Sequence, residues 1–511
     1  MSLARTRSIA LVGVAGHLVE VEADLSQGVP GLSLIGLPDT ALSEARDRVR
    51  AAVVNSAARW PNRRMTINLS PASLPKRGSG FDLALALCVL AADDQLDPAA
   101  VAELVVLGEL GLDGRVRGVR GVLPAVLAAV EAGAERVVVP AANAAEAALV
   151  PGARVLGVNS LAEALRVLRG EQPVPDIEEP SRESESAAAL DLADVAGQLD
   201  ARYAVEIAAA GGHHLLMYGP PGVGKTMLAE RLPGILPPLT AQESLAVTAV
   251  HSVAGALPQG SPLLTRAPLL APHHTATVAS IVGGGSGVPR PGAASLAHHG
   301  VLLLDEAPEF ASGVLDALRQ PLESGSITLS RASGSVRYPA RFQLVLAANP
   351  CPCGLASTSD QCRCPPQQQR RYVGRLSGPL LDRIDLAVGV GQPSRVDLAD
   401  GRTGESSAVV GARVALARQR ASGRWRDTPW ACNAQVPGPE LRGSTWRLPA
   451  ADIDPAHEAF GRGRISARGV DRVLRLAWTL ADLAGKDRPG RPEVLTALHL
   501  RTSAQLPGLA A

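Results

Sequence analysis

The stretch Leu215-Leu-Met-Tyr-Gly-Pro-Pro-Gly-Val-Gly-Lys-Thr226 decides the fold of the central part of the chain. Its first four residues predict a short strand, which runs into the pattern G-x-x-x-x-G-K-T, and Met227–Leu232 predicts a helix. A glycine-rich loop between a strand and a helix directs backbone N–H groups at phosphates. The loop residues are Gly219, Pro220, Pro221, Gly222, Val223, Gly224, Lys225 and Thr226. We predict an ATP site in which Lys225 neutralises the β- and γ-phosphates and Thr226 ligates Mg²⁺.

A second motif, Gly300-Val-Leu-Leu-Leu-Asp-Glu306, follows about eighty residues later. Four consecutive apolar residues before two acids are typical of a buried parallel strand that presents carboxylates at its C-terminal edge. We predict that Asp305 holds the Mg²⁺ shell and that Glu306 is the general base for the attacking water. An ordinary strand followed by an acidic turn is the alternative.

A third apolar strand, Phe342–Ala348, ends at Asn349. An amide at this position could orient the lytic water and sense the γ-phosphate. On its own, an asparagine at a strand end is more often a turn residue. Beside the other two motifs, we assign Asn349 to the site.

Composition sets the broad class. The chain has 511 residues, with 46% hydrophobic and 19% charged residues, which predicts about three globular domains. The formal net charge is +1, so a nucleic-acid partner would have to be held by a local basic surface. The longest apolar run, Leu83–Ala92, is too short to span a membrane, and the six cysteines do not resemble a secreted disulfide framework. We expect a cytoplasmic protein with no membrane partner.

Four segments follow from the hydrophobic pattern, and together they predict an α/β protein with a C-terminal helical part. Residues 1–168 alternate short strands with helices. Residues 169–190 are rich in Pro, Ser and Glu and form a linker, with an acidic binding tail as the alternative. Residues 191–390 carry the nucleotide motifs, and residues 391–511 form a small helical domain. The expected N-terminal strands are Ser8–Val14, Val19–Ala23, Met65–Leu69, Val105–Leu107 and Arg136–Val139, and the expected C-terminal helices are Ala412–Arg420, Asp454–Gly461, Val470–Leu483 and Pro492–Leu500.

Four cysteines lie in a short segment as two C-x-C pairs, Cys351, Cys353, Cys362 and Cys364. Four thiolates suit a tetrahedral structural Zn²⁺. Reduced free cysteines or redox-labile thiols remain the alternatives, because C-x-C pairs are less diagnostic than C-x-x-C pairs. For His273, His274, His298 and His299 we expect packing or hydrogen-bonding roles, because no carboxylate lies at ligand spacing in the sequence.

Several longer stretches carry a family resemblance. They are Ala271-Pro-His-His-Thr275, Ser295–Phe310, Ala348-Asn-Pro-Cys-Pro-Cys-Gly354, Ser377-Gly-Pro-Leu-Leu-Asp-Arg-Ile-Asp385 and Ser466-Ala-Arg-Gly469, with Gly36-Leu-Pro-Asp-Thr40 near the N-terminus. Together they closely resemble the YifB/ComM family of magnesium-chelatase-like AAA+ proteins over nearly the whole chain. The resemblance implies a homo-hexameric ring motor that acts on branched or single-stranded DNA without sequence preference. It also implies that this motor promotes branch migration when incoming DNA is integrated during natural transformation.

The resemblance also implies roles for individual arginines. Arg383 matches the arginine finger that reaches a neighbour's γ-phosphate, and Arg468 matches the sensor-2 arginine of the lid, although the sequence does not tell which of them acts in trans. Residues 275–297, which include Arg290, match the helix-2 insert. Residues 326–341 match a pre-sensor hairpin in which Arg331, Arg337 and Arg341 would contact DNA phosphates in a pore. An ordinary solvated hairpin is the alternative.

The N-terminal part resembles the Lon-protease-like (ribosomal S5-type) domain through Pro75–Gly80 and Gly108–Arg115. Lon proteases need a Ser-Lys dyad, but the matching positions are Gly80 and Leu123. A serine without a base is a poor nucleophile, so we expect an inactive scaffold. A chelatase-like ATP-driven remodeller of a protein partner and a slow nucleotide-gated scaffold are the competing functions. Trp478 stands where the family has arginine in the lid helix, which puts the lid's contacts in question.

Overall fold

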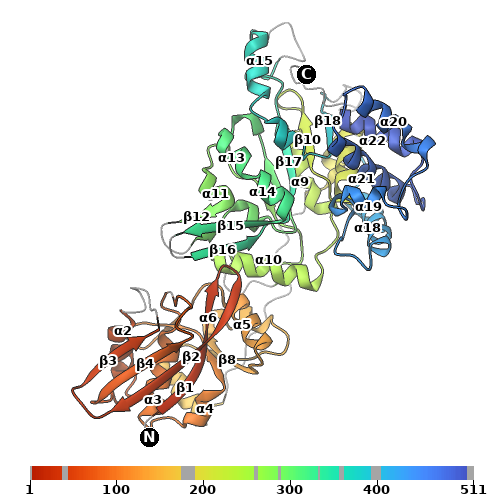
Figure 1. The fold of residues 1–511 in the computed structure, drawn as a ribbon. Coiled ribbons are helices and arrows are strands. Elements are labelled where there is room, and N and C mark those ends of the chain that lie inside the picture. The colour runs from red at the N-terminus through yellow and green to blue at the C-terminus, as the bar shows by residue number, and fades with distance from the viewer. Residues whose placement is uncertain are drawn as a thin grey trace. The chain divides into compact units, whose positions relative to one another are not determined.

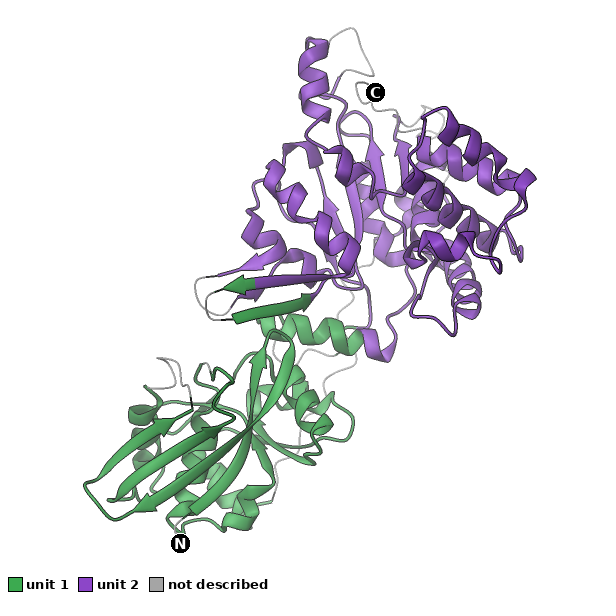
Figure 2. Cartoon of the chain, in the orientation of Figure 1, with its two compact units in different colours: residues 1–186, 244–264, 330–338 green, residues 187–243, 265–329, 339–511 purple. Residues whose placement is uncertain are grey.

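The computed structural model describes residues 3–36, 44–76, 78–173, 190–257, 263–285, 289–331, 334–355, 362–392 and 404–502. Residues 37–40 of the family motif, most of the expected linker and residues 503–511 lie outside these ranges. The chain divides into two compact units, shown in Figure 2. Unit 1 takes in residues 1–186, 244–264 and 330–338, and unit 2 takes in residues 187–243, 265–329 and 339–511.

A seven-stranded mixed sheet forms the centre of unit 1 (Figure 1). Its strands lie in the order β3-β4-β2-β1-β5-β8-β9. β1, β2 and β4 pair antiparallel, whereas β5, β8 and β9 continue from β1 in parallel. The bounds are β1 Leu3–Val12, β2 Ala15–Ser26, β3 Gly31–Ile35, β4 Arg64–Ser70, β5 Leu104–Val106, β8 Arg136–Pro140 and β9 Arg154–Val158.

Helices cover the sheet of unit 1. Every residue of α3 (Asp82–Ala92) is buried, and α3 packs on β1 and β2. The remaining helices of eight residues or more before the linker are α2 Ala45–Asn55, α5 Val122–Glu131, α6 Ala141–Ala148 and α7 Leu161–Leu168. The apolar run Leu83–Ala92 thus lies in α3, where its side chains fill the core of unit 1. All five expected strands occur, and β1 begins five residues earlier than expected because Arg5 and Arg7 alternate with buried Ala4 and Thr6.

Unit 2 is built on a five-stranded parallel sheet in the order β11-β14-β17-β10-β18. The strands are β10 Leu215–Tyr218, β11 Leu269–Leu270, β14 Val301–Leu304, β17 Gln343–Ala348 and β18 Leu386–Gly389. β14 and β17 are buried throughout, as continuous apolar runs in parallel sheets are. The predicted α/β class is confirmed.

The C-terminal part of unit 2 is helical, as expected. Its main helices are α18 Ser407–Arg424, α20 Ala450–Gly461, α21 Ala467–Leu483 and α22 Arg491–Thr502. α21 carries a buried stripe that includes Val470, Val473, Leu474 and Trp478, which is the spacing of one helix face. α8 (Leu199–Gly211) and α9 (Lys225–Ile235) pack against α18, so these helices share one hydrophobic core with the sheet.

Candidate functional site

The three predicted nucleotide motifs meet at one edge of the parallel sheet. The glycine-rich loop follows β10, Asn349 follows the adjacent β17, and Asp305 follows β14 beyond it. Because the strands are parallel, their carboxyl ends lie at the same edge, where open α/β sheets bind ligands. Gly222 and Gly224 have φ values of 76° and 91°, which other residues rarely adopt.

Lys225 opens α9 and is largely buried. Its Nζ donates to the carbonyls of Gly219 and Pro220, both at 2.8 Å, and to Oδ1 of Asn349 at 3.0 Å. Burial lowers the pKa of Lys225, while the nearby Asp305 and Glu306 carboxylates raise it. The two carbonyl oxygens and the amide oxygen that accept from Lys225 are neutral and therefore weak acceptors. A phosphate would be a better partner for the ammonium group.

Thr226 and Asp305 form an oxygen pair suited to Mg²⁺. The Thr226 hydroxyl donates to Oδ2 of Asp305 at 2.7 Å. Mg²⁺ prefers hard oxygen ligands and keeps several waters, so one hydroxyl, one carboxylate and substrate phosphates would complete its shell. The residues present therefore fit this ion.

Glu306 stands at the same edge with an unusual backbone. Its φ is 51°, in the left-handed region that non-glycine residues seldom adopt. Its Oε2 lies 3.4 Å from Nδ1 of His274, and its side chain is 51% exposed.

Two contacts at this edge involve residues that the sequence did not assign to the site. One is His274, whose hydrogen-bonding role was expected but whose partner was not. The other is Gln198, in the left-handed region before α8, whose amide donates to the Val223 carbonyl of the loop. A lone glutamine or histidine has no local signal, and only the His-His pair after β11 could have drawn attention to His274.

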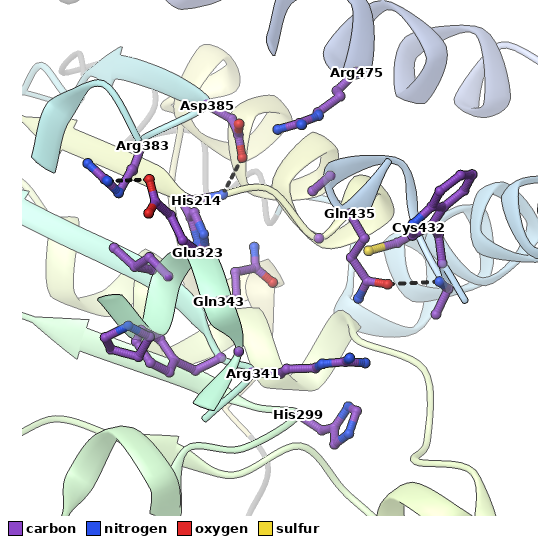
Figure 3. Close-up of a pocket in the computed structure, with 18 of the residues that line it drawn as sticks. His214, His299, Glu323, Arg341, Gln343, Arg383, Asp385, Cys432, Gln435 and Arg475 are labelled. Atoms are coloured by element: carbon purple, nitrogen blue, oxygen red, sulfur yellow. Dashed lines mark hydrogen bonds and ion pairs between the residues drawn. The ribbon is translucent and has the colours of Figure 1, made fainter. Parts of the chain in front are cut away.

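The two family-implied arginines lie elsewhere, beside a cavity of about 710 Å³ in unit 2 (Figure 3). Arg383 pairs with Glu323, and Arg468 Nη1 lies 3.7 Å from Oδ2 of Asp382. Arg383 precedes β18, whose first residue pairs with Leu215 at the start of β10. Arg383 therefore lies at the amino ends of the strands, and Arg468 lies beside the same cavity. The glycine-rich loop of the same chain lies at the carboxyl ends, and a four-residue strand between the two ends spans about 13 Å.

Asp385 is a buried charge in the wall of this cavity. Its Oδ2 accepts from the His214 N–H at 3.0 Å, and its other oxygen pairs with Arg472 of α21. Burial alone would raise the pKa of Asp385, but Arg472 and His213 lower it well below the usual value. Figure 3 shows Arg475 extending from the lid toward the same carboxylate. Asp385 therefore joins the β18 end of the sheet to the helical part.

Removing the partner of this buried carboxylate is expected to be costly. Arg472→Met would leave Asp385, with a 2% exposed side chain, without its main cation. Breaking a buried ion pair from one side costs about 3–5 kcal/mol of the free energy of unfolding. Urea unfolding of the wild type and the variant measures this loss. Arg462→Met, which removes an exposed pair with Glu458, is the control and should change stability by less than about 1 kcal/mol.

Trp478 lies among other aromatic residues of the C-terminal helical part. It is fully buried and packs edge-on against Trp425 and Trp446, and the Arg424 guanidinium lies 4.4 Å from its ring centroid. Arg424 also pairs with buried Asp482. Trp478 is therefore held inside the C-terminal helical part by packing and a cation–π contact.

The predicted hairpin occurs as β15 (Ser326–Arg331) and β16 (Gly334–Pro339). Arg331 and Arg337 are exposed on these strands. Arg341 lies beyond β16, before β17, where its side chain lines the cavity and its N–H donates to Nδ1 of His298 at 3.0 Å. Arg341 is therefore not part of either hairpin strand. Arg290 is an exposed residue of the short strand β13 (Arg290–Pro291).

The four clustered cysteines have metal-site geometry. Their ligand atoms all lie within 4.8 Å of one another, and the Cys351–Cys353, Cys353–Cys362 and Cys351–Cys362 sulfur distances are 3.2, 3.5 and 3.8 Å. Four sulfurs bound tetrahedrally to Zn²⁺ at 2.3 Å would be about 3.8 Å apart. The residues therefore fit zinc. Among the described residues no other His, Cys, Asp or Glu group of three or more is placed to share a metal.

In unit 1, the residues nearest to a Ser-Lys dyad have other partners. The Ser79 hydroxyl bonds to the Glu109 carboxylate, and buried Lys76 donates to the Pro71 carbonyl. Leu123, at the position where a Lon protease needs lysine, is fully buried in α5.

A parallel sheet in which the inner strand β10 runs into a G-x-x-x-x-G-K-T loop, with an Asp-Glu pair after β14, two strands away, defines a P-loop nucleotide-binding protein. Family models agree with this class. Those described as "Magnesium chelatase, subunit ChlI", "Subunit ChlI of Mg-chelatase" and "Magnesium chelatase, subunit ChlI C-terminal" match residues 191–398, 21–143 and 404–501.

Whole-chain similarities are extensive. An uncharacterised protein of Mycobacterium tuberculosis is 55% identical over 98% of this chain and 99% of its own length. Competence protein ComM of Haemophilus influenzae is 42% identical over 99% of both chains, and protein YifB of Escherichia coli is 41% identical over 98% of this chain and 96% of its own. The chain belongs to the YifB/ComM family of magnesium-chelatase-like AAA+ proteins. Lon protease of Mycolicibacterium smegmatis is 28% identical over 35% of this chain and 23% of its own.

Among the described helices, none combines the length and the apolar character that a bilayer crossing requires.

Proposed function

We propose that this chain is a Mg²⁺-dependent ATPase that assembles into a homo-oligomeric ring, a hexamer, and moves on DNA. The observation that carries the proposal is the meeting of Lys225, Thr226, Asp305 and Asn349 within hydrogen-bonding distance at one sheet edge. ComM, a competence protein, and the AAA+ family support the DNA and ring parts of the proposal. Because the proposed substrate is DNA, we propose that the protein acts in the cytoplasm.

In this proposal each residue at the sheet edge has one task. The N–H groups of residues 219–226 and the Lys225 ammonium hold the phosphates, while Glu306 accepts the proton of the attacking water. Asn349 orients that water. Mg²⁺, when bound beside Thr226 and Asp305, would neutralise charge that develops on the phosphates.

The position of Arg383 and Arg468 supports a ring. Both lie at the strand edge opposite the glycine-rich loop, so neither is placed to reach the γ-phosphate of its own chain. We propose that the cavity edge of one subunit faces the nucleotide of the next, and that both arginines act in trans. Arg383 would exchange Glu323 for phosphate, which a planar guanidinium binds in a bidentate manner.

We propose further that residues 1–168 form an inactive Lon-like scaffold, that residues 169–190 link it to the ATPase core of residues 191–390, and that residues 391–511 form the lid. The separate partners of Ser79 and Lys76 support inactivity. We also propose a structural Zn²⁺ at Cys351, Cys353, Cys362 and Cys364, whose sulfurs have the required spacing.

DNA contact is assigned to the hairpin. Arg331→Glu/Arg337→Glu is expected to weaken DNA binding and to make the slope of log K against log [salt] shallower by at least about 1. The reason is that binding releases fewer counterions when fewer phosphates are contacted. Fluorescence anisotropy with a labelled single strand at several salt concentrations measures both. Arg462→Glu/Arg464→Glu, which reverses two exposed charges of the C-terminal helical part, is the matched control. An unchanged slope in the hairpin variant would reject this assignment, and Arg341 and Arg290 would then be tested singly.

A chelatase-like remodeller of a protein partner is the second candidate, because three family models described by the ChlI subunit of magnesium chelatase match this chain. It predicts ATP hydrolysis that no DNA alters. The same hairpin variant would then bind DNA like the wild type at every salt concentration.

A further inference from the structure

The cysteine cluster lies directly behind the nucleotide site. Cys351 is two residues after Asn349, whose Oδ1 accepts from Nζ of Lys225. Cys351 is fully buried, whereas Cys353 is exposed. The chain therefore passes from the amide at the phosphate edge straight into the thiolate group.

The turn between the two cysteine pairs also contacts the glycine-rich loop. Gly354 has φ of 76°, and a Cβ added there would lie 2.5 Å from Cδ and 2.7 Å from Cγ of Pro221. Real Cβ atoms are not found so close to another heavy atom, so only glycine allows this approach. Pro221 follows the two residues whose carbonyls accept from Lys225. The cysteine turn thus supports the loop from outside.

The helix that follows the second cysteine pair connects this pair with the other half of the site. Gln369 of α15 (Pro366–Val373) donates to the Cys364 carbonyl at 2.9 Å. Just after α15, Arg375 Nη1 donates to the Pro308 carbonyl at 3.0 Å. Pro308 belongs to the short helix η2 (Ala307–Glu309), which begins immediately after Glu306. The segment is therefore anchored on both sides of the catalytic edge.

We propose that the tetrathiolate site is a metal centre whose occupancy sets the shape of the nucleotide site, so that Zn²⁺ and ATP bind with positive coupling. Thiolates held this close repel one another unless a cation neutralises them. Loss of the metal would release the turn at Cys351 and Cys353 and withdraw Gly354 from Pro221. The loop that presents Lys225 would then lose its outer support. This inference rests on the proposed ATP and zinc sites and is independent of DNA.

Coupling between two sites must be reciprocal. If zinc raises the affinity for nucleotide by a given factor, nucleotide raises the affinity for zinc by the same factor. Typical coupling factors are about 5–150. Equality of the two factors separates true coupling from general damage caused by stripping the metal.

The experiment uses the full chain, loaded with zinc or stripped of it. A fluorescent, non-hydrolysable ATP analogue gives the nucleotide Kd in both states, and competition with a chromogenic zinc chelator gives the zinc Kd with and without the same analogue and Mg²⁺. We expect each Kd to fall by the same factor, at least about 5-fold, when the other ligand is present. A chain that binds no zinc, or a zinc Kd that nucleotide leaves unchanged, would overturn the proposal.

Three variants sharpen the test. Gly354→Ala and Pro221→Ala keep all four cysteines but alter the contact between the turn and the loop, so both should bind zinc with a coupling factor near 1. Cys353→Ser removes an exposed ligand and should bind nucleotide as weakly as the stripped wild type, whatever the zinc concentration. Full coupling in both contact variants would contradict the proposed route. Tryptophan fluorescence of the lid cluster, which includes Trp425 and Trp478, checks that each variant is folded. A failure of DNA stimulation would reject the motor and leave these binding constants unaffected.

Discussion

Arg383→Ala is expected to lower kcat for ATP hydrolysis by about 10³–10⁵-fold, the range that an arginine finger supplies to phosphoryl transfer. ATP affinity should change much less than kcat, because an arginine finger mainly stabilises charge that develops in the transition state. Steady-state hydrolysis and binding of a fluorescent ATP analogue measure the two quantities. Arg319→Ala, which removes an exposed arginine paired with Asp316, is the matched control and should keep the wild-type rate.

Mixing inactive variants tests whether Arg383 acts in trans. Lys225→Ala cannot hold ATP phosphates but keeps its arginine, whereas Arg383→Ala keeps its nucleotide site. In an equal mixture about one quarter of the interfaces would join an intact site to an intact arginine, so up to about one quarter of the wild-type rate should return. A mixture no more active than its components would show that Arg383 acts within its own chain or that subunits do not exchange.

Glu306→Gln is expected to lower kcat by about 10²–10⁴-fold, because the amide cannot accept a proton from the attacking water. ATP should still bind, and the variant should hold ATP without hydrolysing it. Single-turnover hydrolysis and filter binding of labelled ATP measure the two effects.

The control for this variant is another carboxylate in the same turn. Glu309, which pairs with Arg375, is three residues away, and Glu309→Gln should retain most of the rate. A Glu306→Gln protein with nearly wild-type kcat would show that a different group activates the water. His274, 3.4 Å from Glu306, would then be the first residue to examine.

The nucleotide edge could be predicted from the sequence because each motif is contiguous. A strand followed directly by a glycine-rich loop and a helix specifies the local fold. The parallel strands then bring Asp305 and Asn349 to the same end of the sheet as Lys225. The cysteine site has a comparable local signal, four sulfurs within fourteen positions. The expected strands and helices were found for the same reason, with boundaries shifted by a few residues.

Other features depend on tertiary contacts and could not be predicted. Asp385 and Arg472 are 87 positions apart, and nothing local indicates that they form a buried pair. Arg341 lies close to the hairpin in sequence, yet its side chain lines the cavity because β16 ends at Pro339. The contact between Gly354 and Pro221 joins two turns whose sequences give no sign of each other.

The most direct test of the proposed DNA motor is the steady-state ATPase rate of the full chain with and without single-stranded, duplex and four-way-junction DNA. The account predicts strong stimulation by DNA that Glu306→Gln and Arg383→Ala both abolish and that Arg331→Glu/Arg337→Glu weakens. Robust hydrolysis that no DNA changes would contradict it and would favour a protein client.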